Sequence, residues 1–234
     1  MEKSSQDHRV LMNVPFFASL GPSELATLAE NLVGRQFATG QVIFHLGDPG
    51  GLLYVITSGK VKISQTSPEG HEVLLAILGN SDFFGELALL DDSPRSATAA
   101  AIEPTSTLTL HRDAFLAYLT SDPAFARHVL NVLARRIRHL NNQISDIFFL
   151  DLPARLARIL LQLSERYGLP TKGGTAIDIP LTQTDLAEMT GATRVSVNKA
   201  LGRFRRNNWV RVEGRQVSVL EPDALRHLIQ MSGG

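Results

Sequence analysis

The stretch Phe83–Ala100, FFGELALLDDSPRSATAA, is mostly apolar or small, yet it carries two charges in unusual places. Glu86 directly follows a glycine, and Arg95 directly follows a proline. A charge in such an apolar stretch needs a partner, because an unpaired charge is costly to bury. From the residues alone two interpretations stay open: Glu86 and Arg95 form an ion pair that braces a loop, or they hold a ligand together.

The second interpretation has a specific chemistry. A cyclic-nucleotide phosphate in the pocket of a small β-barrel needs backbone N–H groups, a cation, and an acceptor for the ribose hydroxyl. Gly85 allows a close backbone approach, Glu86 can accept from a 2′-hydroxyl, and Arg95 can form a charge-assisted bond to phosphate. Ser96 and the backbone after it add donors of the kind found in anion-binding turns. The stretch suits a nucleotide as well as it suits an ion pair.

The sequence around this stretch predicts a β domain. Between residues 35 and 110, turn signals separate the short β-prone runs QVIFHL, LLYVITSG, KVKISQT, EVLLAIL and STLTLH. Short strands with this spacing predict a small antiparallel sandwich or barrel. A short helix over Pro22–Leu32, with Ser23 as its cap, is expected before it.

After the β domain the apolar residues follow a heptad pattern. They recur in steps of four and three over about three heptads, at Ala126, Leu130, Leu133, Ile137, Leu140, Ile144 and Ile147. This seam is narrower than the stripe that a helix usually presents to its own domain. It favours a parallel homodimer in which the helix pairs with its twin; packing on its own domain is the alternative.

A new helix is predicted to begin at Asp151-Leu152-Pro153, with aspartate as cap and proline in the first turn, and to end at Tyr167. The junction between Phe149 and Asp151 therefore marks a boundary. We expect a β domain with flanking helices over 1–122, a dimerisation helix and hinge over 123–150, and a DNA-binding domain over 151–234.

The segment after residue 180 predicts a helix-turn-helix. Thr182 and Asp185 have the spacing of a capping box that starts a short helix. Gly191 ends this helix in a tight turn, and Thr193 caps the next one. Two helices joined in this way form a helix-turn-helix. Two packed helices with solvated arginines are the alternative, which leaves the coincidence of turn, caps and basic start unexplained.

The exposed side of this motif predicts DNA binding. The second helix begins with Arg194, Ser196 and Lys199, which are types that reach base edges and phosphates in the major groove. The run VRVEGRQVSV predicts a hairpin that forms a wing with Arg215 at its tip. The expected DNA-contacting residues are Thr182, Gln183, Thr193, Arg194, Val195, Ser196, Asn198, Lys199, Gly214 and Arg215.

Charge and composition support this division. Lys plus Arg and Asp plus Glu both number 23, but from Asp151 onward there are 12 basic and 8 acidic residues, against 11 and 15 before it. A basic end favours a nucleic-acid partner. The chain has no cysteine, which excludes disulfides and cysteine-ligated zinc or iron–sulfur sites. We interpret the polar first ten residues as a loose end and not as a signal peptide, and no apolar run is long enough for a membrane span, so we expect a cytoplasmic protein with no membrane partner.

The motifs resemble those of one family. FGELALL from Phe84 and PRSAT from Pro94 resemble the phosphate-binding cassette of cyclic-nucleotide-binding domains, and the chain from about Val14 to Leu228 resembles the CRP/FNR family of transcription regulators. The resemblance implies an α+β fold with an N-terminal, jelly-roll-like cyclic-nucleotide-binding β-roll, a long dimerisation helix and a C-terminal winged helix-turn-helix. It also implies a homodimer that binds palindromic double-stranded DNA, has RNA polymerase as a partner, takes cyclic AMP as allosteric ligand, and needs no metal.

By the resemblance, Glu86 is the ribose ligand, and Arg95 and Ser96 are the phosphate ligands. The full expected nucleotide site is Phe84, Gly85, Glu86, Leu87, Arg95, Ser96, Ala97, Leu140 and Asn141. Leu140 and Asn141 depart from the Thr-Ser pair that offers hydroxyls to adenine in the family. Val195 departs from the glutamate that often reads a cytosine amino group, so readout of that base pair is expected to change.

Three alternative functions compete with this interpretation. A regulator of the same family that responds to cyclic di-GMP, or that is active without ligand, stays open because Leu140 cannot hydrogen-bond to a base. An enzyme is not expected, since no G-x-S-x-G, Walker or H-E-x-x-H motif is present. A channel gate or regulatory subunit with the same nucleotide module would have no use for the winged helix-turn-helix.

Overall fold

The computed structural model describes residues 21, 28 and 30–232, apart from 68, 69 and 71. The chain divides into two compact units, of which one ends at Ile137 and the other begins at Arg138. The helix predicted over Pro22–Leu32 falls mostly outside the described residues.

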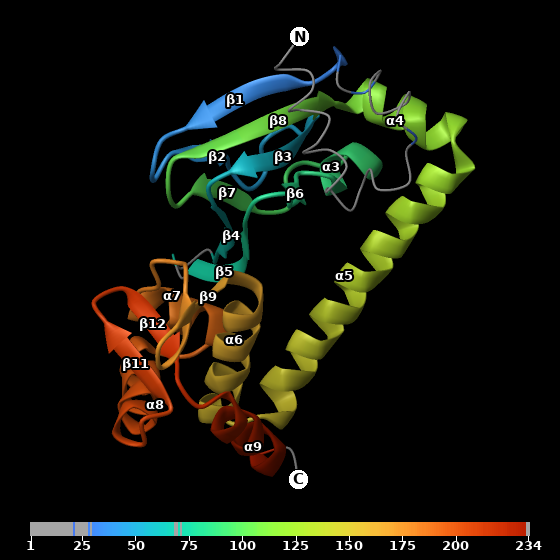
Figure 1. Ribbon diagram of the computed structural model, residues 1–234. Helices are drawn as coiled ribbons and strands as arrows, with labels where there is room; N and C mark the ends of the chain where they lie inside the picture. The colour runs from blue at the N-terminus through green and yellow to red at the C-terminus, as the bar shows by residue number, and fades with distance from the viewer. Residues whose placement is uncertain (1–20, 22–27, 29, 68–69, 71, 233–234) are drawn as a thin grey trace. The chain divides into compact units, whose positions relative to one another are not determined.

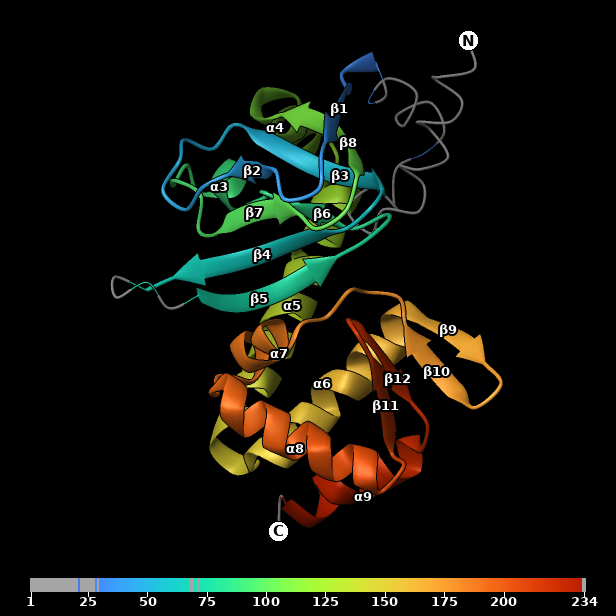
Figure 2. The ribbon, with the colours of Figure 1, turned by 90° about the vertical axis from the view of Figure 1, so that its left-hand side faces the viewer.

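The described part of the first unit contains two four-stranded antiparallel sheets (Figures 1 and 2). The strands are β1 (Val33–Phe37), β2 (Val42–Phe44), β3 (Leu52–Ser58), β4 (Val61–Thr66), β5 (Glu72–Leu78), β6 (Phe83–Phe84), β7 (Thr98–Ala101) and β8 (Thr105–His111). Their order is β1-β8-β3-β6 in one sheet and β2-β7-β4-β5 in the other. The prediction of a small antiparallel sandwich or barrel is confirmed.

Strand β3 is buried on both faces, and its alternating side chains serve two different cores. Leu53 and Val55 pack in a cluster with Phe115 and Phe125 of the helices that follow β8. Tyr54 and Ile56 point to the other face and pack in a second cluster with Phe84. This is the expected consequence of a period of two in a strand that has partners on both sides.

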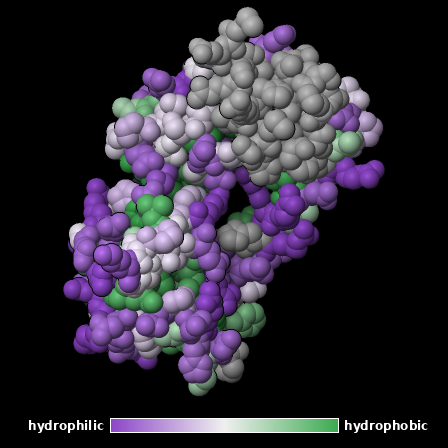
Figure 3. Space-filling model, in the orientation of Figure 1, coloured by the Kyte–Doolittle hydropathy of each residue, from purple (hydrophilic) through white to green (hydrophobic). Residues whose placement is uncertain are grey.

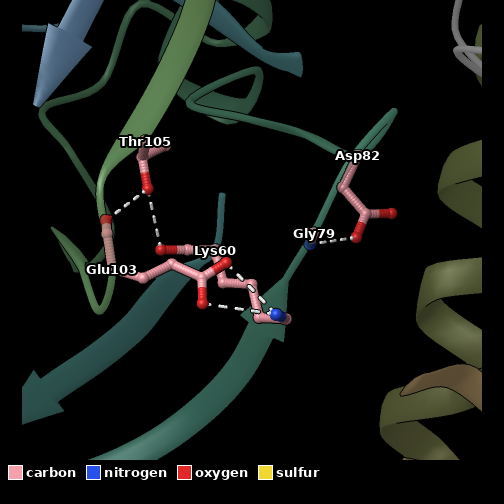
Figure 4. A network of polar contacts seen from close by, with 5 residues as sticks. All are labelled: Lys60, Gly79, Asp82, Glu103 and Thr105. Carbon is pink, nitrogen blue, oxygen red and sulfur yellow. Dashed lines mark hydrogen bonds and ion pairs between the residues drawn. The ribbon is translucent and has the colours of Figure 1, made fainter. Parts of the chain in front are cut away.

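A polar network joins the two sheets at one end (Figure 4). Lys60, between β3 and β4, pairs through Nζ with Glu103 Oε1 at 3.1 Å. Thr105 Oγ1 donates to the carbonyls of Lys60 and Glu103 at 3.1 and 2.8 Å. Because β3 and β8 belong to one sheet and β4 and β7 to the other, these contacts fasten two of the connections that cross between the sheets, β3 to β4 and β7 to β8.

Two helices follow the strands, α4 (Arg112–Ser121) and α5 (Pro123–Phe149). The first turns of α5 bury Phe125, Val129 and Val132 in the core of the first unit. The predicted heptad residues behave differently. Leu133 is partly buried against that core, whereas 51–65% of the surface of five others is exposed: Leu130, Ile137, Leu140, Ile144 and Ile147.

The second unit holds the C-terminal elements. They are α6 (Leu152–Tyr167), β9 (Gly168–Thr171), β10 (Gly174–Ile177), α7 (Gln183–Thr190), α8 (Arg194–Arg206), β11 (Val210–Glu213), β12 (Gln216–Val219) and α9 (Pro222–Ser232). The strands form one antiparallel sheet in the order β11-β12-β10-β9. Helix α6 begins as predicted, since Asp151 Oδ1 accepts from the Ala154 N–H at 2.9 Å. The β9–β10 hairpin was not predicted.

The described helices include none that is both long and apolar enough to cross a membrane.

Candidate functional site

Glu86 and Arg95 of the stretch Phe83–Ala100 are both buried in the first unit. The stretch leaves β6, forms the short helix α3 (Leu87–Leu90) and reaches β7 through a loop. Glu86 is 4% exposed and Arg95 is 5% exposed. Since buried charges are retained only where partners compensate for the lost water, the contacts of these two residues show what the site can do.

Arg95 lies among backbone carbonyls and aromatic rings. Its Nη1 donates to the carbonyl of Gly85 at 2.8 Å, and its Nη2 donates to that of Leu52 at 2.9 Å. The guanidinium carbon lies 4.3 Å from the centre of the Phe44 ring and 5.8 Å from that of Tyr54, which is cation–π distance.

The guanidinium of Arg95 is incompletely satisfied. Its buried Nε has no hydrogen-bond partner among the described residues. Burial lowers the pKa of Arg95, while Tyr54, Glu86 and Asp48 oppose that shift. A buried cation that keeps one N–H without an acceptor is suited to an anionic ligand.

Gly85 makes the position of Arg95 possible. Its φ is +82°, and a Cβ there would lie 2.5 Å from Arg95 Nη1 and 3.0 Å from the Leu52 carbonyl oxygen. A side chain would therefore displace the guanidinium or strain the backbone. The sequence predicted close approach to a ligand at Gly85; the structure shows close approach to Arg95.

Glu86 pairs with a residue that the sequence interpretation did not single out. Arg136 of α5 forms an ion pair with Glu86 Oε1 and donates from Nη2 to the Phe83 carbonyl at 3.0 Å. Its guanidinium carbon lies 4.2 Å from the centre of the Phe83 ring. Glu86 forms no ion pair with Arg95 in the described structure. The first of the two interpretations of the sequence, an ion pair between these residues that braces a loop, is therefore wrong.

The loop that carries Arg95 is held against the segment after β2. The Gly47 N–H donates to the Arg95 carbonyl, and the Arg95 N–H donates to the Asp48 carbonyl, both at 2.8 Å. Gln65 Nε2 donates to the Ser96 carbonyl at 2.6 Å. These bonds fix the backbone on both sides of Arg95 and leave the Ser96 side chain exposed.

The structure brings together most of the predicted nucleotide-site residues. Phe84, Gly85, Glu86, Arg95, Ser96 and Ala97 all lie in the first unit, and the Phe84 ring stacks on Tyr54 with centroids 5.0 Å apart. Leu87 begins α3 and is 46% exposed. Leu140 and Asn141 lie on α5 beyond Ile137, in the second unit, and both are exposed.

The predicted helix-turn-helix is present in the second unit. Thr182 and Asp185 form the capping box: Thr182 Oγ1 accepts from the Asp185 N–H, and the Asp185 carboxylate accepts from the Thr182 N–H. Gly191 ends α7 with φ +62° in the left-handed conformation. Helix α8 starts at the predicted cap, Thr193, and buries Val197, Ala200, Leu201 and Phe204.

The opposite side of α8 is exposed and basic. Arg194, Val195, Asn198 and Lys199 are exposed there. Within the described part of the chain, the side chains of Arg194 and Lys199 make no hydrogen bond or ion pair. The other polar groups are engaged: Thr193 Oγ1 lies 2.9 Å from Ser196 Oγ, and Gln183 Nε2 donates to Asn198 Oδ1 at 3.2 Å. The two unpaired cations are thus available to a partner.

The β11–β12 hairpin lies beside the start of α7. Its turn contains Gly214 at φ +60°, and the Arg215 carbonyl accepts from the Leu181 N–H at 2.8 Å. A surface hollow of about 360 Å³ is lined by Thr182, Gln183, Thr184, Arg194, Gly214 and Arg215. On the face visible in Figure 3, hydrophilic residues cover the edge of the second unit where α7 and this hairpin lie in Figure 1.

Comparison with known families matches each unit to a separate domain. Residues 34–122 match the cyclic nucleotide-binding domain, and residues 154–228 match the Crp-like helix-turn-helix domain. The first match contains Glu86 and Arg95, and the second contains α7, α8 and the β11–β12 hairpin.

Whole proteins of the same architecture are also similar. A CRP-like cAMP-activated global transcriptional regulator of Mycobacterium tuberculosis is 39% identical over 216 residues, which cover 92% of this chain and 96% of the relative. The cyclic AMP receptor protein of Thermus thermophilus is 35% identical over 215 residues, 88% of this chain and 95% of the relative. A c-di-GMP responsive global regulator of Xanthomonas campestris has the same fold, with a TM-score of 0.74 at 20% identity over 85% of this chain and 99% of that one.

Proposed function

The chain belongs to the CRP/FNR family of transcription regulators, and from this premise we propose that it is a homodimeric, sequence-specific DNA-binding regulator under allosteric control by cyclic AMP. The family consists of transcription regulators and not of enzymes. The cyclic nucleotide-binding and helix-turn-helix domains make the chain a cyclic-nucleotide-responsive, DNA-binding regulator.

The observation that carries the nucleotide assignment is the buried Nε of Arg95, which has no acceptor among the described residues. We assign the cyclic phosphate to Arg95 and Ser96, because phosphate oxygens supply the missing acceptor in a charge-assisted bond. We assign the ribose hydroxyl to Glu86. Arg136 pairs with its Oε1, and this holds the carboxylate while Oε2 can accept from the hydroxyl. Phe84, Gly85, Leu87 and Ala97 complete the phosphate side of the site, and Leu140 with Asn141 would meet the base.

Cyclic AMP is favoured as effector by the relative from Mycobacterium tuberculosis, whose description names cAMP activation at 39% identity. Leu140 favours the alternative of cyclic di-GMP, or of activity without ligand, because its side chain has no group that could hydrogen-bond to adenine. Calorimetric titration with cyclic AMP and with cyclic di-GMP tests the choice. We expect cyclic AMP to bind once per chain and more tightly; tighter binding of cyclic di-GMP, or no heat with either, would assign the alternative.

The dimer is supported by the apolar residues that α5 leaves exposed. Five of its heptad positions are at least 51% exposed in the single chain. A parallel second copy would bury the five side chains in one seam, as in a two-stranded coiled coil. Light scattering should give the mass of a dimer, and Ile144→Asp, which puts a charge into the seam, should give a monomer. A monomeric parent protein would exclude this interface.

Two paired winged helix-turn-helix units would match a palindromic DNA site, because the two-fold axis of the protein then coincides with that of the site. We assign base or phosphate contacts to Arg194, Lys199 and Arg215 and to the other residues predicted to contact DNA.

With these roles the chain divides into residues 1–122 for nucleotide binding, 123–150 for dimerisation and 151–234 for DNA binding. A regulator of this kind works beside RNA polymerase, in the cytoplasm.

A further inference from the structure

Two valines on α8 have opposite environments. Val197 is 0% exposed and packs in the core of the second unit, whereas Val195, two residues earlier, is 80% exposed. No other large apolar side chain among the described residues is more exposed than Val195. A helix surface normally carries polar residues at such a position, so this side chain calls for an apolar partner outside the chain.

The position of Val195 restricts what that partner can be. It is the second residue of α8 and lies in the first turn, two positions after the cap Thr193. The residues three and four positions later, Asn198 and Lys199, are exposed on the same side of the helix. Arg194 and Lys199 make this side cationic, so an apolar protein surface or a lipid tail would be a poor match. A partner with both negative charge and one apolar group fits the surface.

Duplex DNA has this combination in its major groove. Its phosphates are negative, and thymine is the one base that presents a methyl group there. The polar groups near Val195 are largely engaged inside the protein: the Thr193 and Ser196 hydroxyls contact each other, and Asn198 Oδ1 accepts from Gln183. In the first turn of α8, direct hydrogen bonding to bases is thereby left to Arg194, while apolar contact is available at Val195.

We propose that Val195 selects thymine by contact with its C5 methyl group at one position of each half-site. This inference rests on the proposed DNA-binding function and names the base that Val195 contacts. The selection against cytosine has a physical cause, since a valine leaves the cytosine amino group without an acceptor and without water. Arg194 and Lys199 would hold the helix against guanine edges or phosphates on either side of this contact.

The test replaces thymine by uracil, which removes only the methyl group. A preferred site is first selected from DNA with randomised positions by the full-length protein with cyclic AMP. Each thymine of a half-site is then replaced in turn by deoxyuridine, symmetrically in both half-sites, and the affinity is measured. We expect one position at which the loss is roughly fourfold per half-site, the factor that corresponds to burial of one methyl group.

Three variants assign that loss to Val195. In Val195→Ser the thymine and uracil sites should bind equally well at this position. In Val195→Glu the preferred base there should become cytosine, because a carboxylate accepts from its amino group. Lys199→Ala is the matched control on the same helix: it should weaken binding to both sites alike and keep their ratio.

The outcomes separate this inference from the function it rests on. If the parent protein binds its selected site and no thymine-to-uracil change weakens binding, Val195 does not read a methyl group. The same holds if Val195→Ser keeps the full discrimination. If the parent protein selects no site at all, with or without cyclic AMP, the proposed DNA-binding function fails as well.

Discussion

The two functional regions handle charge in opposite ways. In the first unit, Glu86 and Arg95 are almost completely buried, and each is held by fixed partners: Arg136 for Glu86, and backbone carbonyls with an aromatic ring for Arg95. On α8, the side chains of Arg194 and Lys199 are exposed and make no hydrogen bond or ion pair within the described chain. A buried site is therefore expected to depend on single residues, whereas an exposed basic surface spreads its binding energy over many.

Arg95→Ala should have the largest effect. It removes the one cation of the cassette and its charge-assisted bonds to phosphate, worth about 1.5–3 kcal/mol. This corresponds to at least about a tenfold loss of affinity for cyclic AMP, measured by calorimetry. Arg35→Ala, which removes an exposed cation from β1, should bind as the parent does.

Arg95→Lys keeps the charge but lacks the planar fork, so its affinity should lie between those of the parent and Arg95→Ala. Thermal unfolding of each variant shows whether the unit is still folded. Unchanged affinity in a folded Arg95→Ala protein would mean that the cassette binds no phosphate.

Arg194→Ala should show how an exposed cation differs. If Arg194 contacts a base, the loss should be about 1–3 kcal/mol on the specific site and small on random DNA. Arg206, in the last turn of α8, provides the comparison. Arg206→Ala should weaken binding to specific and random DNA alike and reduce the salt dependence of binding. Mobility shifts at several salt concentrations measure both. Equal losses on the two DNAs for Arg194→Ala would limit Arg194 to phosphate contacts.

Phe44→Leu tests whether the ring below Arg95 positions the guanidinium. The loss of the cation–π contact should weaken cyclic-AMP binding by about 1 kcal/mol. Phe44→Tyr keeps the ring and should restore the affinity, whereas a purely volume-filling role would be served by leucine as well. Calorimetry measures the cyclic-AMP affinity of both variants. Equal affinities of Phe44→Leu and Phe44→Tyr would show that the ring does not position Arg95.

Leu140→Thr should have an effect of similar size but opposite sign. The added hydroxyl can hydrogen-bond to adenine, which limits the gain to about 1 kcal/mol, while the seam of α5 loses apolar contact. We expect tighter cyclic-AMP binding and a larger ratio of DNA affinity with ligand to DNA affinity without it. If fluorescence anisotropy gives parent and variant the same ratio, Leu140 is only a packing residue of α5, and other residues couple nucleotide binding to DNA binding.

The sequence predicted best the features that short-range chemistry determines. The capping box at Thr182, the cap at Asp151 and the turn at Gly191 each depend on residues within a few positions, and all three are present. The strands β1 and β7 and the β9–β10 hairpin were missed. VGRQF, TAAA and GLPT have neither strong β propensity nor clear alternation, and their neighbours in the sheet stabilise them.

The candidate site shows the same division. Gly85, Glu86 and Arg95 could be found from one local motif, but the partner of Glu86 could not. Arg136 lies 50 positions along the chain on another element, and nothing in its own surroundings distinguishes it from the other arginines of α5. Only the packing of α5 against the β domain creates that contact.

We propose that a nucleotide bound at the buried Glu86 and Arg95 changes the affinity of the exposed cations of α8 for DNA. The direct test is fluorescence anisotropy of a labelled selected DNA site, with the full-length protein and with Arg95→Ala, each with and without saturating cyclic AMP. We expect cyclic AMP to raise the DNA affinity of the parent by a factor of about 5 or more, the usual lower range of allosteric coupling, and to leave Arg95→Ala unchanged. The same DNA affinity for the parent with and without cyclic AMP would show that the nucleotide does not control DNA binding.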